Sequence, residues 1–355
     1  MVKQDRLVFM DLSAIVSSFA VVVLHTAGSL VNIRSNSYMK LTACIAILIN
    51  IVFAYGVPMF FMQSGANLLN YRNRYSTKIF FKKRIDKVVL PFIIWSVIGF
   101  LILYFQGNKN LNFLKFFIEG NIVGPYWFFY TIIAFYFCVP FLSVIVEGGN
   151  KKLLTYLLVV TLIVNSILPL ILQTLKMNST GIGQSFPAIG QYLQWFIVGY
   201  VILNYKLKHA KLIYVVGISS MVMEIILTFW ATFCLPYNSF YGYATGSLVK
   251  NFYDIQYIFA FLTFSAFFFF LKQKEESLKK CQFRKIIEKF SRYSYGVYLI
   301  HPILLMTLMP YMTRALTPVP MIIKFIILPI SIYSISVLLT ILIKKLPRFS
   351  SALIP

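Results

Sequence analysis

The stretch DLSAIVSSFAVVVLHTAG, residues Asp11 to Gly28, decides the fold because it is long and apolar enough to cross a bilayer. A helix of about 20 residues spans a hydrocarbon core of about 30 Å. The stretch nevertheless contains an acid, Asp11, and a histidine, His25. Their spacing of two heptads places both on one stripe of a helix, together with Ala14. An ionisable group inside a span is costly, so both are functional candidates.

The rest of the chain repeats this apolar pattern. Of its 355 residues, 59% are hydrophobic and 12% are charged, a balance that is rare in soluble proteins. The apolar runs are continuous, which favours helices over the alternating strands of a membrane barrel. We therefore expect an all-α, polytopic membrane bundle of about ten transmembrane helices. The predicted spans are residues 8–28, 41–63, 88–106, 125–146, 153–174, 188–204, 212–234, 254–271, 294–313 and 321–343.

The net charge of +23 is explained by membrane orientation. Most of the 33 Lys and Arg residues lie in segments that would all face one side of the membrane, the positive-inside pattern. This distribution predicts cytoplasmic termini and argues against nucleic acid as a partner. The predicted inner segments are residues 1–7, 64–87, 147–152, 205–211, 272–293 and 344–355.

The chain is expected to form a single integral-membrane domain, residues 1–355, without a soluble domain. The first span lacks a small-residue cleavage site and is interpreted as a retained helix rather than a signal peptide. Residues 272–293 mix apolar and basic residues at helical spacing and predict an amphipathic helix on the inner surface. The four cysteines form no CxxC motif, so neither a disulfide nor a metal site is expected.

The ionisable candidates inside predicted spans are Asp11, His25, Glu224, His301 and Lys324. His25 lies about 21 Å from Asp11 by helical rise, near the outer edge of the membrane. His301 is expected near the middle of its span. Each histidine has a structural alternative, an interhelical hydrogen bond for His25 and a packed ring at a kink for His301. Two neutral histidines also fit acid–base chemistry near neutral pH.

Asp11 is too far from His25 to orient it, so we assign it a structural role, pairing with Arg6 or Arg84. Arg84 and Lys87, in KKRIDKVVLP, share a helix face at the mouth of the third span. Orientation alone can explain these cations, but they also suit a phosphate-bearing cytoplasmic ligand.

Five stretches resemble one known family: MDLSAIVSSFAVVVLHTAG, YGVPMFFMQSGANLL, KKRIDKVVLPFIIWS, GPYWFFYTIIAFYFCVPFL and SRYSYGVYLIHPILL, with QWFIVGYVI as a weaker sixth. In this order they are similar to the acyltransferase 3 family of integral membrane acyltransferases, which modify surface polysaccharides and other envelope molecules. The resemblance implies a ten-helix core, a cytoplasmic acyl-CoA donor and a sugar hydroxyl as the usual acceptor.

The resemblance also implies roles for particular residues. The catalytic histidine of the family matches His25. The family's Arg-x-x-Arg matches Arg84 to Lys87, with lysine in the second place, and its serine–glycine pair matches Ser64 and Gly65. The late Tyr-Leu-Ile-His-Pro matches Tyr298 to Pro302, which adds Tyr298 and His301 to the expected pocket.

The chain departs from the family at position 14, where Ala14 replaces an arginine eleven residues before the histidine. Three consequences stay open: Lys324 or Arg84 replaces the lost cation, the chemistry is altered, or the fold persists without acyl transfer. The family's His-Leu-Trp-Phe in the fourth helix is Pro125 to Phe128 here. Tyr126 and Trp127 are then candidates for stacking on a sugar, or members of the interfacial aromatic belt.

We predict a membrane acyltransferase that moves an acyl group, acetyl by preference, from acyl-CoA to a hydroxyl of an envelope polysaccharide or an undecaprenyl-linked oligosaccharide. No bound cofactor is expected, and the location is the inner membrane of a bacterium. The alternative is a glycan exporter on the same fold, with Glu224, Lys324 and His301 forming a polar relay. A polysaccharide polymerase is a weaker alternative because the predicted outer loops are short.

Overall fold

The structure is a computed structural model that describes residues 6–30, 40–109, 111–174, 192–234, 255, 257–346 and 350–355. This part of the chain is helical and contains no strand. Its α-helices are α1 (Val8–Leu30), α2 (Lys40–Phe53), α3 (Gly56–Leu68), α4 (Thr77–Arg84), α5 (Leu90–Phe105), α6 (Phe113–Ile118), α7 (Trp127–Glu147), α8 (Lys151–Leu162), α9 (Leu168–Thr174), α11 (Leu193–Asn204), α12 (Ala210–Cys234), α14 (Ile258–Gln273), α15 (Glu275–Lys280), α16 (Arg284–Phe290), α17 (Ser294–Thr307), α18 (Met309–Ala315), α19 (Met321–Lys344) and α20 (Ser350–Leu353).

The described helices confirm a polytopic helical membrane protein. Seven continuous helical segments are long and apolar enough to cross a bilayer, and a pair bent by 58°, Arg284–Thr307 with Met309–Ala315, forms an eighth candidate. The shorter apolar helices α11 and α14 fall in two further predicted spans. Every predicted span therefore lies mostly in helix where it is described, with breaks such as those at residues 54–55 and 308, while the number of crossings and the side of the termini stay predictions.

Two predicted segments differ from the structure. The helix that contains the third predicted span begins well before residue 88, because α4 continues through a π-helical turn (Ile85–Val89) into α5 as one segment, Thr77–Phe105. The basic residues near its start hide this helix from a hydropathy pattern. The amphipathic segment 272–293 is broken into the end of α14, the short helices α15 and α16, and a 3₁₀ turn (Ser291–Tyr293).

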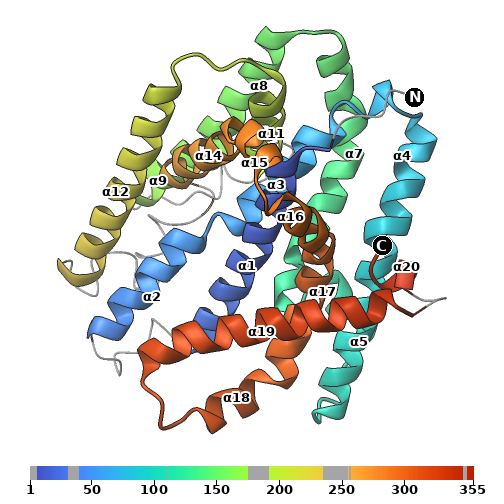
Figure 1. The fold of residues 1–355 in the computed structure, drawn as a ribbon, viewed down its shortest axis with the longest axis vertical. Coiled ribbons are helices and arrows are strands. Elements are labelled where there is room, and N and C mark those ends of the chain that lie inside the picture. The colour runs from blue at the N-terminus through green and yellow to red at the C-terminus, as the bar shows by residue number, and fades with distance from the viewer. Residues whose placement is uncertain are drawn as a thin grey trace.

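Helix α1 lies inside the bundle, where it packs against α2 and α3 on one side and α17 and α19 on the other (Figure 1). The tightest contact between two other helices joins α3 to α11. A Cβ atom on Gly65 would lie 1.7 Å from the Phe196 carbonyl oxygen, and one on Gly199 would lie 2.1 Å from the Met62 oxygen. Only glycine permits this backbone contact, as at other small-residue interfaces between membrane helices.

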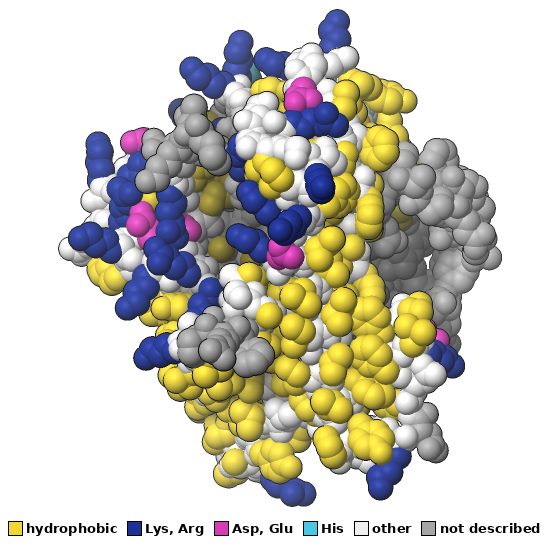
Figure 2. Space-filling model, turned by 90° about the vertical axis from the view of Figure 1, so that its right-hand side faces the viewer, with side chains coloured by type: hydrophobic (Ala, Val, Ile, Leu, Met, Phe, Trp, Pro, Cys, Tyr) yellow, Lys and Arg dark blue, Asp and Glu magenta, His cyan; other side chains and the backbone are white. Residues whose placement is uncertain are grey.

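Charged side chains gather at one end of the molecule, which we call the basic end (Figure 2). The N-terminus of α1 is anchored there. Asp11 pairs with Arg6 at 2.6 Å and accepts a hydrogen bond from Ser291 Oγ at 2.7 Å. The Glu275 carboxylate accepts hydrogen bonds from the backbone N–H groups of Val8 and Phe9. These contacts satisfy donors that a helix start leaves free, and the carboxylate suits the positive end of the helix dipole.

Candidate functional site

The two intramembrane histidines meet between α1 and α17. The ring centroids of His25 and His301 lie 5.5 Å apart, with an angle of 36° between the ring planes. The sequence placed them at different depths, with His25 near the edge and His301 near the middle of the membrane. The packing of α1 against α17 instead brings them into contact.

His301 is fully buried and its two ring nitrogens differ. Nδ1 lies 3.0 Å from the carbonyl oxygen of Val297. Because a carbonyl oxygen only accepts, Nδ1 must bear the proton in the neutral ring, and Nε2 is then an acceptor with a free lone pair. Nε2 has no hydrogen-bond partner among the described residues. A buried unsatisfied polar atom costs about 1–3 kcal/mol, so this nitrogen calls for a functional explanation.

His25 is partly exposed as a residue whereas His301 is fully buried, so His25 is the more accessible member of the pair. Its backbone oxygen accepts a hydrogen bond from Ser29 Oγ at 2.8 Å, but its ring has no hydrogen-bond partner within the described part of the chain. The pair thus combines one accessible imidazole with one buried imidazole whose free nitrogen can accept a proton or a hydrogen bond.

Two tyrosines tie α17 to the start of α7. Tyr298, whose ring lies 5.6 Å from that of His301, donates a hydrogen bond to the Pro125 carbonyl at 2.8 Å. Tyr126 donates one to the Leu299 carbonyl at 2.6 Å. These bonds fix the turn of α17 that precedes His301.

Tyr126 is buried rather than exposed in the structure. Its side chain is 2% exposed and lies beside the middle of α17, and its part in binding a sugar stays a prediction. The tyrosine occurs at the first residues of a span, as belt residues do, and sequence alone does not distinguish the two settings. The neighbouring Trp127 is partly exposed and packs on Tyr192, at 5.4 Å between centroids, rather than on the histidines.

A pocket of about 250 Å³ near the basic end contains Arg84 and Ser64. The Arg84 guanidinium lies 5.7 Å from the ring centroids of both Phe80 and Tyr136. Its Nε is buried and has no hydrogen-bond partner among the described residues. The pocket is lined by Phe60, Gln63, Ser64, Asn67, Leu68, Arg84, Val88, Phe128, Phe129, Ile132, Tyr136 and Tyr295. Arg84 is the only cation in this lining, and the site therefore suits an anion.

Lys87 does not line this pocket and is exposed. The π turn Ile85–Val89 accounts for the separation from Arg84. A π turn contains more residues than an α turn, so side chains three positions apart no longer share a face. The two cations of the predicted donor site are therefore not equivalent: one lies in the pocket and the other on the surface.

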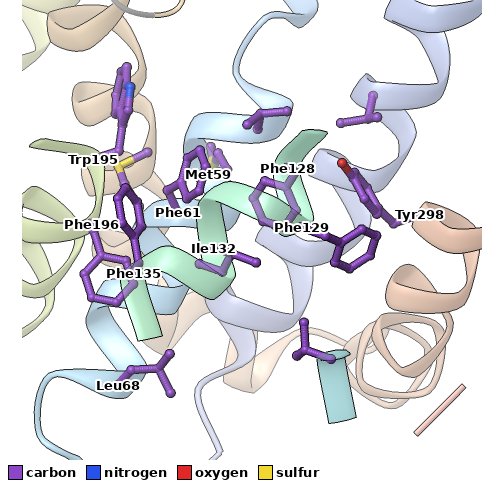
Figure 3. Packing of buried hydrophobic residues seen from close by; sticks show 14 of the residues in the cluster. Met59, Phe61, Leu68, Phe128, Phe129, Ile132, Phe135, Trp195, Phe196 and Tyr298 are labelled. Atoms are coloured by element: carbon purple, nitrogen blue, oxygen red, sulfur yellow. The ribbon is translucent and has the colours of Figure 1, made fainter. Parts of the chain in front are cut away.

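Aromatic side chains separate the Arg84 pocket from the histidine pair. Phe60, Phe128 and Phe129 line the pocket, and their ring centroids lie 5.7, 5.3 and 5.5 Å from that of Tyr298. Figure 3 shows Phe128 and Phe129 beside Tyr298 in the buried cluster. We call these four residues the aromatic partition. A chain of ring contacts therefore runs from the pocket lining to Tyr298, from Tyr298 to His301, and from His301 to His25.

The position of the missing arginine lies next to a contact with this pocket. Gln63, in the pocket lining, donates a hydrogen bond to Ser13 Oγ at 2.8 Å, and Ser13 precedes Ala14. Of the two cations proposed as substitutes, Arg84 lies in this pocket. Lys324 instead directs its Nζ to the Thr317 carbonyl at 3.5 Å and does not line the pocket.

The remaining candidates lie away from the pair. Asp11 belongs to the basic end, with Arg6 as its partner. Glu224 is fully buried on α12, and neither carboxylate oxygen has a hydrogen-bond partner among the described residues. Within the described ranges, no hydrogen bond or ion pair joins Glu224, Lys324 or His301 to another of the three, so the predicted relay is not assembled there.

Sequence analysis missed Gln63 and Tyr295, which line the Arg84 pocket. Both are uncharged at neutral pH, so neither carries the large cost of a charge in lipid that distinguishes the other candidates. A glutamine directly before Ser64 inside a predicted span was nevertheless a visible signal, because a polar amide in lipid needs a partner. The aromatic partition gave no such signal, since phenylalanines occur throughout the spans.

The family comparison agrees with this architecture. A family model described as an acyltransferase domain matches residues 7–344, nearly the whole chain. The protein is therefore a membrane acyltransferase. The chain belongs to the acyltransferase 3 family, which confirms the resemblance seen in the sequence. Comparison with curated proteins and with solved structures gives no match.

Proposed function

We propose that the protein transfers an acyl group, acetyl by preference, from cytoplasmic acyl-CoA to a hydroxyl of a cell-envelope polysaccharide or its undecaprenyl-linked precursor. The membrane would be the inner membrane of a bacterium. The observation that carries the proposal is the accessible imidazole of His25, in ring contact with a second histidine. A neutral imidazole is suited to take a proton from a hydroxyl near neutral pH.

Arg84 is proposed to bind phosphate groups of the donor. Its guanidinium has an unused buried N–H, and charge-assisted hydrogen bonds to phosphate are among the strongest in proteins. The pocket of about 250 Å³ is smaller than most sites for drug-sized ligands, which enclose about 300–1,000 Å³. It therefore takes only part of coenzyme A, and the exposed Lys82 and Lys87 on the same helical segment are proposed to contact the remainder.

His25 is proposed to act on the acceptor hydroxyl. As the imidazole takes the hydroxyl proton, the oxygen attacks the thioester carbonyl, the carbon–sulfur bond breaks, and the leaving thiolate takes the proton from the imidazolium. In a second version the His25 nitrogen first displaces the thiolate and carries the acyl group before the hydroxyl accepts it. Both versions need the thioester to reach His25 past the aromatic partition, so those side chains must rotate.

The proposal is tested by measuring the ester content of surface glycan in cells that lack the protein. The cells are complemented with wild type, His25→Ala, or His209→Ala as a control at the histidine outside the bundle core. Mass spectrometry before and after mild alkali detects acyl esters. We expect wild type and His209→Ala to restore an alkali-labile acyl mass and His25→Ala to restore none. Absence of an ester with wild type would overturn the proposal.

The same experiment separates acyl transfer from export. An exporter would change the amount of surface glycan while leaving its ester content the same. The buried Glu224, without a hydrogen-bond partner among the described residues, is the observation that favours this alternative. Glu224→Gln is therefore included: unchanged ester and unchanged glycan amount would remove the support for a relay.

A further inference from the structure

We propose that His301 positions the imidazole of His25 by accepting a hydrogen bond at its Nε2 from an N–H of His25. This bond would fix the His25 tautomer in which the other ring nitrogen is an unprotonated base. The effect on catalysis rests on the proposed acyl transfer, but the bond itself does not. His301 is then a positioning residue, and His25 is the group that touches substrate.

The protonation of His301 gives the first argument. The Val297 carbonyl occupies Nδ1 and requires a proton there, so Nε2 is left as an acceptor. That atom is buried and has no hydrogen-bond partner among the described residues. Among the described residues, two rings contact His301, those of Tyr298 and His25. Tyr298 has already committed its hydroxyl proton to the Pro125 carbonyl, so His25 is the ring with a donor to offer.

The mobility of the two rings gives the second argument. His301 is fully buried, bonded at Nδ1 and followed by Pro302 within α17, so its ring is held in place. His25 is partly exposed and its ring has no hydrogen-bond partner in the described chain. Rotation about its Cβ–Cγ bond, which has a broad torsional preference, would bring an N–H to Nε2. The centroid separation of 5.5 Å leaves room for this rotation.

The proposed bond matters for catalysis because His25, the base, would be held in place by a third group, His301. A hydrogen bond at one imidazole nitrogen decides the tautomer and the orientation of the ring. When His25 takes the hydroxyl proton, the resulting imidazolium donates to Nε2, which stabilises its charge. Carboxylates often perform this role, but Asp11 lies about 21 Å along the helix and is paired with Arg6. The structure assigns the role to a neutral histidine instead.

Nitrogen-15 NMR of histidine-labelled protein in liposomes tests the bond directly. The chain has 3 histidines, so a His209→Gln background leaves two sets of ring signals. We expect His301 to have its proton on Nδ1 and His25 to populate one tautomer. In His301→Asn, His25 should become a mixture of tautomers. A proton on Nε2 of His301, or unchanged His25 signals in the variant, would overturn the proposal. This experiment needs no acyl donor.

Kinetics of the purified protein test the effect on transfer. Asn can still donate to the Val297 carbonyl but has no acceptor at the Nε2 position, whereas Gln can place its amide oxygen there. For His301→Asn we expect kcat to fall about 100-fold with KM for acyl-CoA unchanged. His301→Gln should recover part of the loss. A role in packing alone would instead leave kcat of His301→Asn near that of wild type, which would contradict the proposal. If wild type forms no ester, the proposed function fails while NMR still decides the positioning bond.

Discussion

The two ends of the polar stripe on α1 are built in opposite ways. At the basic end, Asp11 is paired with Arg6 and bonded to Ser291. Toward the other end, the ring of His25 and Nε2 of His301 have no hydrogen-bond partners among the described residues. Both ends place an ionisable group in an apolar helix at a cost. From this difference we infer that Asp11, whose hydrogen bonds are satisfied, holds the helix in position. The histidines, whose polar atoms lack such partners, are available for chemistry.

The largest effect on activity should come from removing the imidazole of His25. His25→Ala is expected to lower kcat for acyl transfer by a factor of about 10²–10⁴, because it removes the proposed base. Its thermal unfolding midpoint should change little, because the only hydrogen bond to the described residues that the ring would lose is the proposed one to His301, worth about 1 kcal/mol. Ester formation by the purified protein and its unfolding in detergent are measured together. A stable variant with full activity would contradict the comparison.

The Arg84 pocket extends the comparison because Nε of Arg84 is also buried without a hydrogen-bond partner among the described residues. Arg84→Ala should raise KM for acyl-CoA by a factor of about 10–100, the equivalent of a charged hydrogen bond worth about 1.5–3 kcal/mol. Lys87→Ala is the matched control, as an exposed ion contact is worth about 0–1 kcal/mol and the residue lies outside the pocket. Initial rates at varied acyl-CoA concentration decide the case. Equal effects of the two variants would contradict the assignment.

Asp11→Ala should have the opposite profile to His25→Ala. It removes the partner of Arg6 and the acceptor of Ser291 Oγ, so we expect a loss of about 2 kcal/mol in unfolding free energy. If kcat of Asp11→Ala is unchanged at a temperature where the variant is folded, Asp11 serves to anchor α1 rather than to assist the chemistry. Chemical denaturation in detergent measures the first quantity and ester formation the second. A loss of kcat without loss of stability would place Asp11 in the chemistry.

The sequence predicted the helical ranges well because each depends on a local run of apolar residues. It also selected His25 and His301, since titratable groups in lipid are few, and Arg84 as a cation at the mouth of the third predicted span. Pairing Asp11 with Arg6 was accessible for the same local reason, as the two residues lie five positions apart.

The contacts between distant helices were not accessible. Local periodicity does not say which helices pack together, so the meeting of His25 and His301 could not be derived. The π turn that separates Lys87 from Arg84 is invisible because a single wider turn alters the spacing of apolar residues over too few positions to be recognised. Gly65 appeared in the sequence only as part of a motif. The structure explains it by the backbone contact with Phe196.

Tyr126, whose hydroxyl bonds the Leu299 carbonyl two residues before His301, provides a further test. It asks whether the hydrogen bonding of a polar group, rather than its distance from the histidines, determines whether it serves stability or catalysis. Tyr126→Phe removes the hydrogen bond to Leu299 and should lower the unfolding free energy by about 1 kcal/mol. Because the phenyl ring retains its packing against Phe92 and Phe129, kcat should stay within about twofold of wild type. Thermal unfolding and ester formation are the measurements. A large loss of kcat would show that a paired group near the site also serves the chemistry.

The smallest effect is expected at the exposed margin of the basic end. The pKa of Glu288 is lowered from its ordinary value of 4.5, chiefly by the hydrogen bond from Arg284 at 2.7 Å. A carboxyl group whose pKa is lowered in the folded state stabilises that state above its ordinary pKa. The contribution is lost as pH falls through the folded-state value. Glu288→Gln should therefore lower the unfolding midpoint slightly at pH 7, and the gap should close below about pH 4.5. Salt should shrink the gap, because exposed pairs are screened. If Glu288→Gln lowers the unfolding midpoint more than Asp11→Ala does, the Arg284–Glu288 pair, rather than the Arg6–Asp11 pair, anchors α1.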